Sequence, residues 1–240
     1  MNTQAISIIG VVGIGIAFLI TIFLYRTSFG SEKDRSSRIK EMTSDALFLA
    51  IVLVMTFVPN LGYISFTPLL TFTLMHIPVL LAASLGGWKK GMLVGFFFGC
   101  SSFAQALTSV SAFNLLFAFP WVAIPPRVVF GLVAGLLFSF IGKLHKGPLK
   151  GLYLALASAG MTLLHTGLVF LDLYIFFPDI ITSMFSSTSP LEYAPAFTIL
   201  TGLLVGVAGE MLIAAIVVPP LSLAISKAVP NLFGKKKRRI

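Results

Sequence analysis

Long apolar stretches separated by short polar segments dominate the pattern along this chain of 240 residues. Seven stretches can be distinguished: residues 5–25, 46–58, 69–85, 91–107, 127–141, 151–177 and 196–226. About 20 apolar residues in a helix span the ~30 Å hydrocarbon core of a bilayer, and a backbone in lipid must satisfy its own hydrogen bonds. The strict alternation typical of a transmembrane β-barrel does not occur. The pattern therefore predicts an all-α membrane protein with seven transmembrane helices.

The composition agrees with a membrane protein. The chain is 57% hydrophobic and 10% charged, whereas soluble domains carry about 25% charged residues. A net charge of +9 would suggest nucleic-acid binding in a soluble protein, but here the basic residues separate apolar stretches and indicate topology. No nucleic-acid partner is expected. The single Cys100 excludes an internal disulfide and is expected to be a small packing residue.

The basic residues predict how the chain crosses the membrane. If residues 26–40 are cytoplasmic, sixteen of the 17 Lys and Arg residues fall on that side. They lie in segments 26–40, 89–90, 143–150 and 227–239. The first stretch lacks a basic segment before it and is long for a signal peptide, so a retained helix is expected. The N-terminus is then outside, and the basic tail lies in the cytoplasm beside anionic lipid.

Arg127 is the one cation that this topology leaves on the outer side. It follows two prolines at the outer end of the fifth stretch. An arginine within a membrane span costs about 2.5–3.5 kcal/mol on insertion scales, so it needs a partner, a wet cavity or a ligand. Snorkelling of the side chain to the interface is the alternative.

Four other titratable residues lie within the apolar stretches: His76, His165, Asp172 and Glu210. His165 and Asp172 are seven residues apart and share one helix face, and Asp172 reaches about the depth of Arg127, so an ion pair is possible. Together these groups predict a polar pocket that opens to the outside. Interhelical hydrogen bonds are the alternative. Glu210 is a ligand contact, a proton site or a structural acid.

Small residues recur at every fourth position. Gly91, Gly95 and Gly99 form one such series, and Gly131 and Gly135 form another. This spacing favours close packing of membrane helices.

Sequence motifs of enzymes do not occur. The chain has no His-Glu-x-x-His, Gly-x-Ser-x-Gly or Walker motif, and three histidines with one cysteine disfavour a transition-metal site. We therefore expect no cofactor, no metal and no enzymatic activity. If ATP drives this protein, another subunit hydrolyses it.

Five local patterns follow one another in a defined order. They are Ala46-Leu47-Phe48-Leu49-Ala50 after a basic and polar segment, Val58-Pro59-Asn60-Leu61-Gly62-Tyr63-Ile64, Thr73-Leu74-Met75-His76-Ile77-Pro78-Val79 followed by Gly86-Gly87-Trp88-Lys89-Lys90-Gly91, Pro126-Arg127-Val128-Val129-Phe130-Gly131, and Gly209-Glu210. In order and spacing they resemble the substrate-binding S components of energy-coupling factor (ECF) vitamin transporters. The resemblance covers residues 38–232 and six of the seven stretches.

The resemblance implies an architecture and a mechanism. A six-helix domain (residues 38–232) would bind a water-soluble vitamin near its outer face, in the plasma membrane of a prokaryote. Residues 1–37 would add an N-terminal helix with a basic linker, and residues 233–240 the basic tail. Members of this family dock on a transmembrane coupling protein that carries two ABC-type ATPases, and then reorient to deliver the vitamin inward. The face with Ala46 and Ala50 would be the docking surface.

The resemblance also suggests a substrate site. Its residues would be Asn60, His76, Arg127, His165, Thr166, Asp172 and Glu210. The family commonly has Asn-Thr where this chain has His165-Thr166, which leaves the vitamin open. The outer Arg127 suits a carboxylate, so pantothenate is the first choice, followed by riboflavin, folate and a hydroxymethylpyrimidine. A stand-alone proton-coupled carrier that uses Glu210 or Asp172 is the alternative function.

Overall fold

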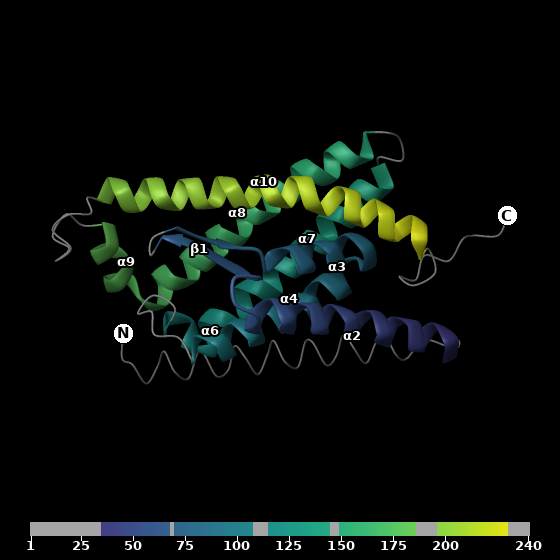
Figure 1. Ribbon diagram of the computed structural model, residues 1–240, viewed down its shortest axis with the longest axis horizontal. Helices are drawn as coiled ribbons and strands as arrows, with labels where there is room; N and C mark the ends of the chain where they lie inside the picture. Colours follow the sequence, from purple (N-terminus) through teal and green to yellow (C-terminus); the bar gives the residue numbers. More distant parts are fainter. Residues whose placement is uncertain (1–34, 68–69, 108–114, 145–148, 186–195, 230–240) are drawn as a thin grey trace.

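Helices make up most of the computed structural model, which describes residues 35–67, 70–107, 115–144, 149–185 and 196–229 (Figure 1). Five of the predicted apolar stretches are confirmed as long helices: α2 (Arg35–Phe57), α4 (Trp88–Ala106), α7 (Pro125–Leu144), α8 (Lys150–Phe176) and α10 (Ala196–Ala228). The first stretch and the basic tail lie outside the described residues. The extra N-terminal helix, the total of seven spans and the division into domains therefore stay predictions.

The third apolar stretch, residues 69–85, differs from the predicted single helix. It contains β2 (Leu70–Thr73), which forms a hairpin with β1 (Tyr63–Thr67), and the helix α3 (His76–Gly86). The strands are antiparallel, with Tyr63 opposite Thr73 and Ile64 opposite Phe72. Threonine and aromatic residues favour a strand, and apolar character alone does not separate a short strand from a helix. The prediction of a helix is wrong for residues 70–73 and confirmed for residues 76–85, and the described fold is mostly rather than entirely α-helical.

The helices α4 and α7 pack together along their glycines, as the spacing predicts. A β-carbon on Gly131 would lie 2.1 Å from the carbonyl oxygen of Gly91, and one on Gly95 would lie 2.3 Å from the carbonyl oxygen of Arg127. Such distances are far below van der Waals contact, so only glycine permits this approach. The backbones of the two helices therefore touch directly along what we call the glycine seam.

Apolar side chains fill the core and also cover the outside of the long helices. Val79, Phe98 and Phe130 are completely buried, whereas Leu156 of α8 and Ile216 of α10 are more than half exposed. Among the described residues, three helical segments are long and apolar enough to cross a membrane: Pro120–Leu144, Lys150–Phe176 and Gly202–Ala228. Exposed apolar faces of this length are stable in lipid. The chain is a multi-pass membrane protein.

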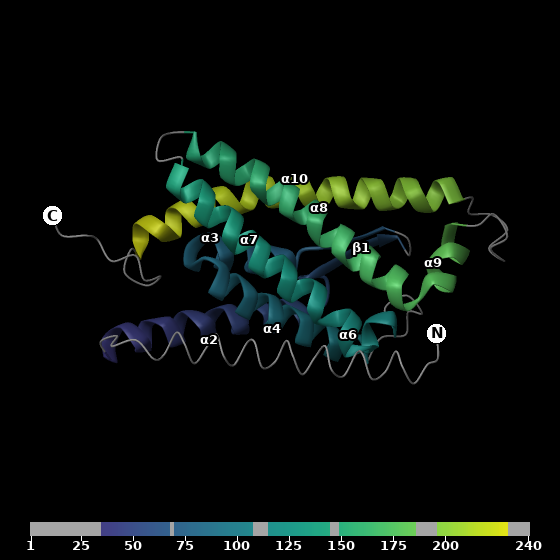
Figure 2. The ribbon, with the colours of Figure 1, turned by 180° about the vertical axis from the view of Figure 1, so that it is seen from behind.

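The molecule has two chemically different ends (Figures 1 and 2). The start of α2, the end of α7, the start of α8 and the end of α10 lie together, to the right in Figure 1. These segments and the start of α4 carry Lys40, Lys89, Lys90, Lys143, Lys150 and Lys227, and we call this the basic end. The hairpin and two short helices, α6 (Pro120–Ala123) and α9 (Pro178–Phe185), lie at the opposite end. The sequence pattern does not predict these short helices.

Candidate functional site

Arg127 takes its conformation from the two prolines that precede it. Pro126 has no N–H group, so it leaves the carbonyl of Val122, one turn earlier, without a helical donor. Nη1 of Arg127 donates to this carbonyl at 3.2 Å and to that of Ala123 at 2.7 Å. The Pro-Pro-Arg sequence therefore turns the guanidinium back towards the junction of α6 and α7.

The guanidinium of Arg127 is buried in protein and does not snorkel to an interface. The residue is 5% exposed, and the guanidinium carbon lies 5.1 Å from the ring centre of Phe98 and 4.9 Å from that of Phe117. Aromatic faces stabilise a cation at such distances. Nε of Arg127 has no hydrogen-bond partner among the described residues. The site thus holds a buried cation with an unused donor.

Two histidines lie side by side near this cation. His76, the first residue of α3, is 0% exposed, and His165 of α8 is 6% exposed. Their ring centres are 6.1 Å apart and the rings are stacked. Phe98 and Phe130 contact the ring of His165, with centres 5.6 and 4.9 Å away. The ring of Phe98 therefore contacts both His165 and Arg127.

The ring nitrogens of these histidines are largely unpartnered. Within the described part of the chain, both nitrogens of His76 and Nε2 of His165 are buried without a hydrogen bond; the backbone of Thr73 approaches His76 but does not reach hydrogen-bond geometry. Buried polar atoms in folded proteins are nearly always hydrogen-bonded. Unpartnered atoms gathered in one place therefore indicate a bound ligand or water.

Asp172 and Trp121 add two further unpartnered atoms. Oδ2 of Asp172 and Nε1 of Trp121 are buried and lack partners in the described structure. Asp172 interacts electrostatically with Arg127, but the two groups do not form a direct ion pair. Trp121 packs in the same apolar cluster as Leu173, the neighbour of Asp172. The ion pair between Arg127 and Asp172 that the sequence allows therefore does not form as a direct contact.

Tyr63 of the hairpin completes this polar group from the other side. Its hydroxyl is in hydrogen-bonding contact with Ser102 of α4 and interacts with the charge of Arg127. Burial raises the pKa of Tyr63 above its ordinary value, although Arg127 opposes this shift. The phenol is therefore neutral and can donate a hydrogen bond.

Glu210 has a defined partner in the hairpin. Its Oε1 accepts a hydrogen bond of 2.6 Å from the backbone N–H of Thr73, and the residue is 7% exposed. The bond connects α10 to β2, three residues before His76. Glu210 thus holds the hairpin against the helices, whatever further contact it makes.

The remaining predicted site residues have local roles. The hydroxyl of Thr166 bonds to the carbonyl of Thr162 in its own helix at 3.3 Å. Asn60 is exposed, and its φ of 60° is one that asparagine tolerates better than most residues. Their contact with a substrate stays a prediction.

The predicted docking face is open. Ala46 and Ala50 are both exposed on α2, together with Leu47 and Val54. The other side of α2 is buried and packs mainly against α4. Within the described part of the chain, α2 lies along one side (Figure 1), and the residues Ala46 and Ala50 on it are exposed.

Sequence reasoning missed Trp121, Tyr63 and Phe98. Trp121 stands four residues before the Pro-Pro-Arg sequence, and Tyr63 lies in the pattern from Val58 to Ile64 that contributes to the family resemblance, so position in the chain could have indicated both. Phe98 is one of 23 phenylalanines and carries no such signal.

Comparison with known proteins places the chain in a family. Residues 40–222 match the family model described as "ECF transporter, substrate-specific component". The Pantothenate transporter PanT of Leuconostoc mesenteroides is 30% identical over 108 residues, which are 43% of this chain and 53% of that protein. The Pantothenic acid transporter PanT of Lactococcus lactis subsp. cremoris is 27% identical over 161 residues, 60% of this chain and 76% of that protein.

These matches have different extents. The similar region spans about half the length of the Leuconostoc protein. The family match, in contrast, extends from α2 to α10 and includes the hairpin, the Pro-Pro-Arg sequence and Glu210. Because that match covers more than half of the 240 residues, the chain belongs to the substrate-specific components of ECF transporters.

Proposed function

We propose that this protein is the substrate-binding subunit of an ATP-driven ECF transporter, and that it captures pantothenate at the outer face of the membrane. The observation that carries the proposal is the buried Arg127, whose Nε lacks a partner and whose surroundings contain further unpartnered polar atoms. A carboxylate is the natural ligand for such a cation. The names of the two similar proteins also support pantothenate.

The other groups of the site suit the rest of this vitamin. Pantothenate carries one carboxylate, one amide, two hydroxyls and two methyl groups. The histidine pair and the indole N–H of Trp121 provide donors and acceptors for amide and hydroxyl groups. Phe98 and Phe130, which contact His165, provide apolar surface for the methyl groups. The mixture of one cation, neutral polar atoms and aromatic rings favours a small, singly charged, hydroxylated ligand.

In the proposed mechanism, delivery of the vitamin into the cell requires partner proteins. The basic end faces the cytoplasm, in line with the positive-inside rule, and Arg127 lies near the outside. The exposed face with Ala46 and Ala50 receives a transmembrane coupling protein that carries two ABC-type ATPases. Small side chains there let the helices of the partner approach closely.

Ligand binding tests the role of Arg127. The full chain, expressed without partners and purified in mild detergent, is titrated with pantothenate and with pantothenol, in which an alcohol replaces the carboxylate. The parent protein should prefer pantothenate. Arg127→Gln should weaken pantothenate binding roughly 10- to 100-fold, as expected for a charge-assisted hydrogen bond, and should leave pantothenol binding nearly unchanged. Equal affinity of parent and variant for pantothenate would contradict the assignment.

Uptake tests the docking face. Ala46→Trp and Ala50→Trp should stop uptake of labelled pantothenate in cells and preserve binding by the purified protein. Leu156→Trp, on the exposed side of α8, is the matched control and should transport normally. Uptake that continues in cells without the ATPases would instead favour a proton-coupled carrier.

A further inference from the structure

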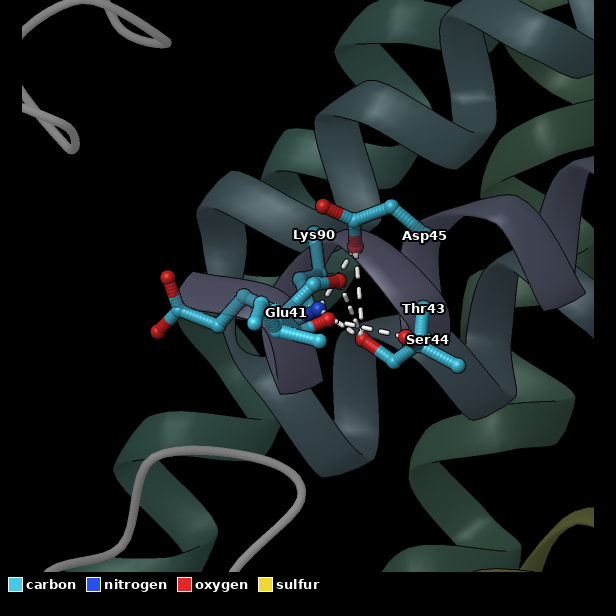
Figure 3. Close-up of polar contacts among 6 residues, drawn as sticks. Glu41, Thr43, Ser44, Asp45 and Lys90 are labelled. Atoms are coloured by element: carbon cyan, nitrogen blue, oxygen red, sulfur yellow. Dashed lines mark hydrogen bonds and ion pairs between the residues drawn. The ribbon is translucent and has the colours of Figure 1, made fainter. Parts of the chain in front are cut away.

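A compact polar cluster joins α2 to α4 near the basic end (Figure 3). Nζ of Lys90 forms an ion pair of 2.5 Å with Oδ1 of Asp45 and also donates to Oγ of Ser44. The hydroxyl of Ser44 donates in turn to the carbonyl of Glu41 at 2.9 Å. The side chains of Lys90 and Asp45 are only 12% and 20% exposed. One lysine is thus linked to two consecutive side chains of α2.

Membrane topology alone does not explain why the side chain of Lys90 is largely shielded from water. A lysine that only marks the cytoplasmic side serves equally well in water. The neighbouring Lys89 differs from Lys90 in being exposed, with its ammonium 5.6 Å from the ring centre of Trp88. Lys90 instead loses hydration, a cost that its ion pair and hydrogen bonds offset.

The aliphatic part of the Lys90 side chain also has a defined position, because it packs against Gly86. A β-carbon on Gly86, at the end of α3, would lie 2.1 Å from Cδ of Lys90. Glycine at this position therefore makes room for the lysine stem to lie against the turn between α3 and α4. The side chain crosses from this turn to α2, so it connects three helices at one point.

The cluster lies directly behind the exposed alanine face. Ser44 is buried and Asp45 half-buried, whereas Ala46 and Ala50 are exposed on the same helix. Successive residues of a helix are rotated by about 100°, so a rotation of α2 that broke the ion pair would also turn the alanines. The bonds to Lys90 thus fix the direction in which this face points.

We propose that Lys90, through its contacts with Asp45 and Ser44, is a positioning residue that holds α2 in the orientation required for docking on the coupling protein. This inference rests on the proposed function, because it concerns the docking face named there. Lys90 itself needs no contact with the partner or with the vitamin. Exposed ion pairs contribute little, but removal of one member of a partly buried pair leaves the other charge unpaired.

The test compares Lys90→Met with Lys89→Met in the full chain. Both variants lose one positive charge from the same turn, and methionine preserves much of the stem that packs on Gly86. Hydrogen–deuterium exchange is measured for α2, with α8 and α10 as internal references. Lys90→Met should accelerate exchange in α2 by about tenfold or more and leave α8 and α10 unchanged. Lys89→Met leaves the bonds from Lys90 to α2 in place, so the exchange rate of α2 should stay close to that of the parent.

Two functional measurements accompany the exchange experiment. Association with the purified coupling protein and its ATPases should weaken about tenfold in Lys90→Met. Pantothenate binding by the isolated subunit should stay within about twofold of the parent, because the substrate site lies at the other end. A general loss of structure would change both quantities. Asp45→Asn combined with Lys90→Met should be no worse than Lys90→Met alone, since the variants break the same interaction.

Each result decides a separate point. Unchanged exchange in α2 of Lys90→Met would overturn the positioning role. Faster exchange with unimpaired association would overturn the link between this ion pair and docking. If the parent chain itself does not associate with the coupling protein, the proposed function fails, whereas the exchange data still decide whether Lys90 positions α2.

Discussion

The hydrogen bond between the side chain of Glu210 and the backbone of Thr73 links two distant parts of this fold. It joins segments that are 137 positions apart in the sequence and connects the hairpin, which brings Tyr63 to the site, to the last helix. A carboxylate is a strong acceptor for a backbone N–H. Under the proposed function, Glu210 therefore acts on the substrate site through the hairpin.

Substitution of Glu210 separates this role from direct contact with a ligand. Glu210→Gln keeps an oxygen that accepts from Thr73, so pantothenate affinity should stay within about threefold of the parent. Glu210→Ala leaves a buried N–H without a partner, which costs about 1–3 kcal/mol, and affinity should fall about tenfold. Calorimetric titration of both variants measures the effect. Equal loss in both would show that the charge of Glu210 itself matters.

Charge counting in the sequence singles out Arg127 but does not distinguish Lys90 from Lys89. Arg127 stands out because sixteen other Lys and Arg residues fit one side of the membrane. The same counting places Lys89 and Lys90 alike on the cytoplasmic side. Lys90 differs from Lys89 because it forms an ion pair with Asp45 of α2. Which residues of two helices pair with each other cannot be predicted from their charges alone. For the same reason, the sequence indicates His165 and Asp172 as polar positions but not which of their atoms lack partners.

The glycine seam is the dominant contact between two elements. It brings α4 and α7 together so closely that each glycine meets the opposite backbone, as at Gly131 and Gly91. Its spacing could be predicted from the sequence because every fourth residue lies on one helix face. The hairpin could not be predicted, since its short apolar strands look like the start of the following helix.

Substitution within the glycine seam should destabilise the whole protein. Gly131→Ala places a methyl group against the backbone of Gly91, and overpacking of this kind costs about 1–3 kcal/mol. Gly160→Ala is the matched control, because a β-carbon there meets no atom within 4 Å; alanine is the better helix former, by up to about 1 kcal/mol. Thermal unfolding in detergent should therefore show a lower midpoint for Gly131→Ala and an equal or higher one for Gly160→Ala. A midpoint unchanged in Gly131→Ala would argue against direct backbone contact.

At the scale of the whole molecule, the two ends differ in chemistry. Lysines gather at the basic end, and Arg127, the hairpin and α9 lie at the other (Figure 2). The sequence predicts this polarity because Lys and Arg positions are visible without any structure. It does not predict how the helices pack around the substrate site, since that depends on contacts between distant segments.

Cysteine labelling tests which end faces outward. In a Cys100→Ala background, single cysteines replace Thr182 of α9, Lys143 of α7 or Lys227 of α10, all exposed residues. A membrane-impermeant maleimide should label the cysteine at 182 in intact cells, because α9 lies on the outer side in the proposed orientation. The cysteines at 143 and 227 should react only after permeabilisation. The reverse pattern would invert the orientation, and with it the direction of vitamin capture.

The helix α4 carries residues of both proposed sites: Lys90 lies in its first turn and Phe98 about two turns later, and the regular rise of the helix fixes their separation. Under the proposed function, vitamin preference and partner recognition are thus separable traits on one rigid support. Substitutions around Phe98 and His165 can change which vitamin is bound and leave the docking surface for the coupling protein intact. Such a protein can diversify its cargo in evolution, or be re-engineered for a new one, while it stays compatible with the same transport machinery.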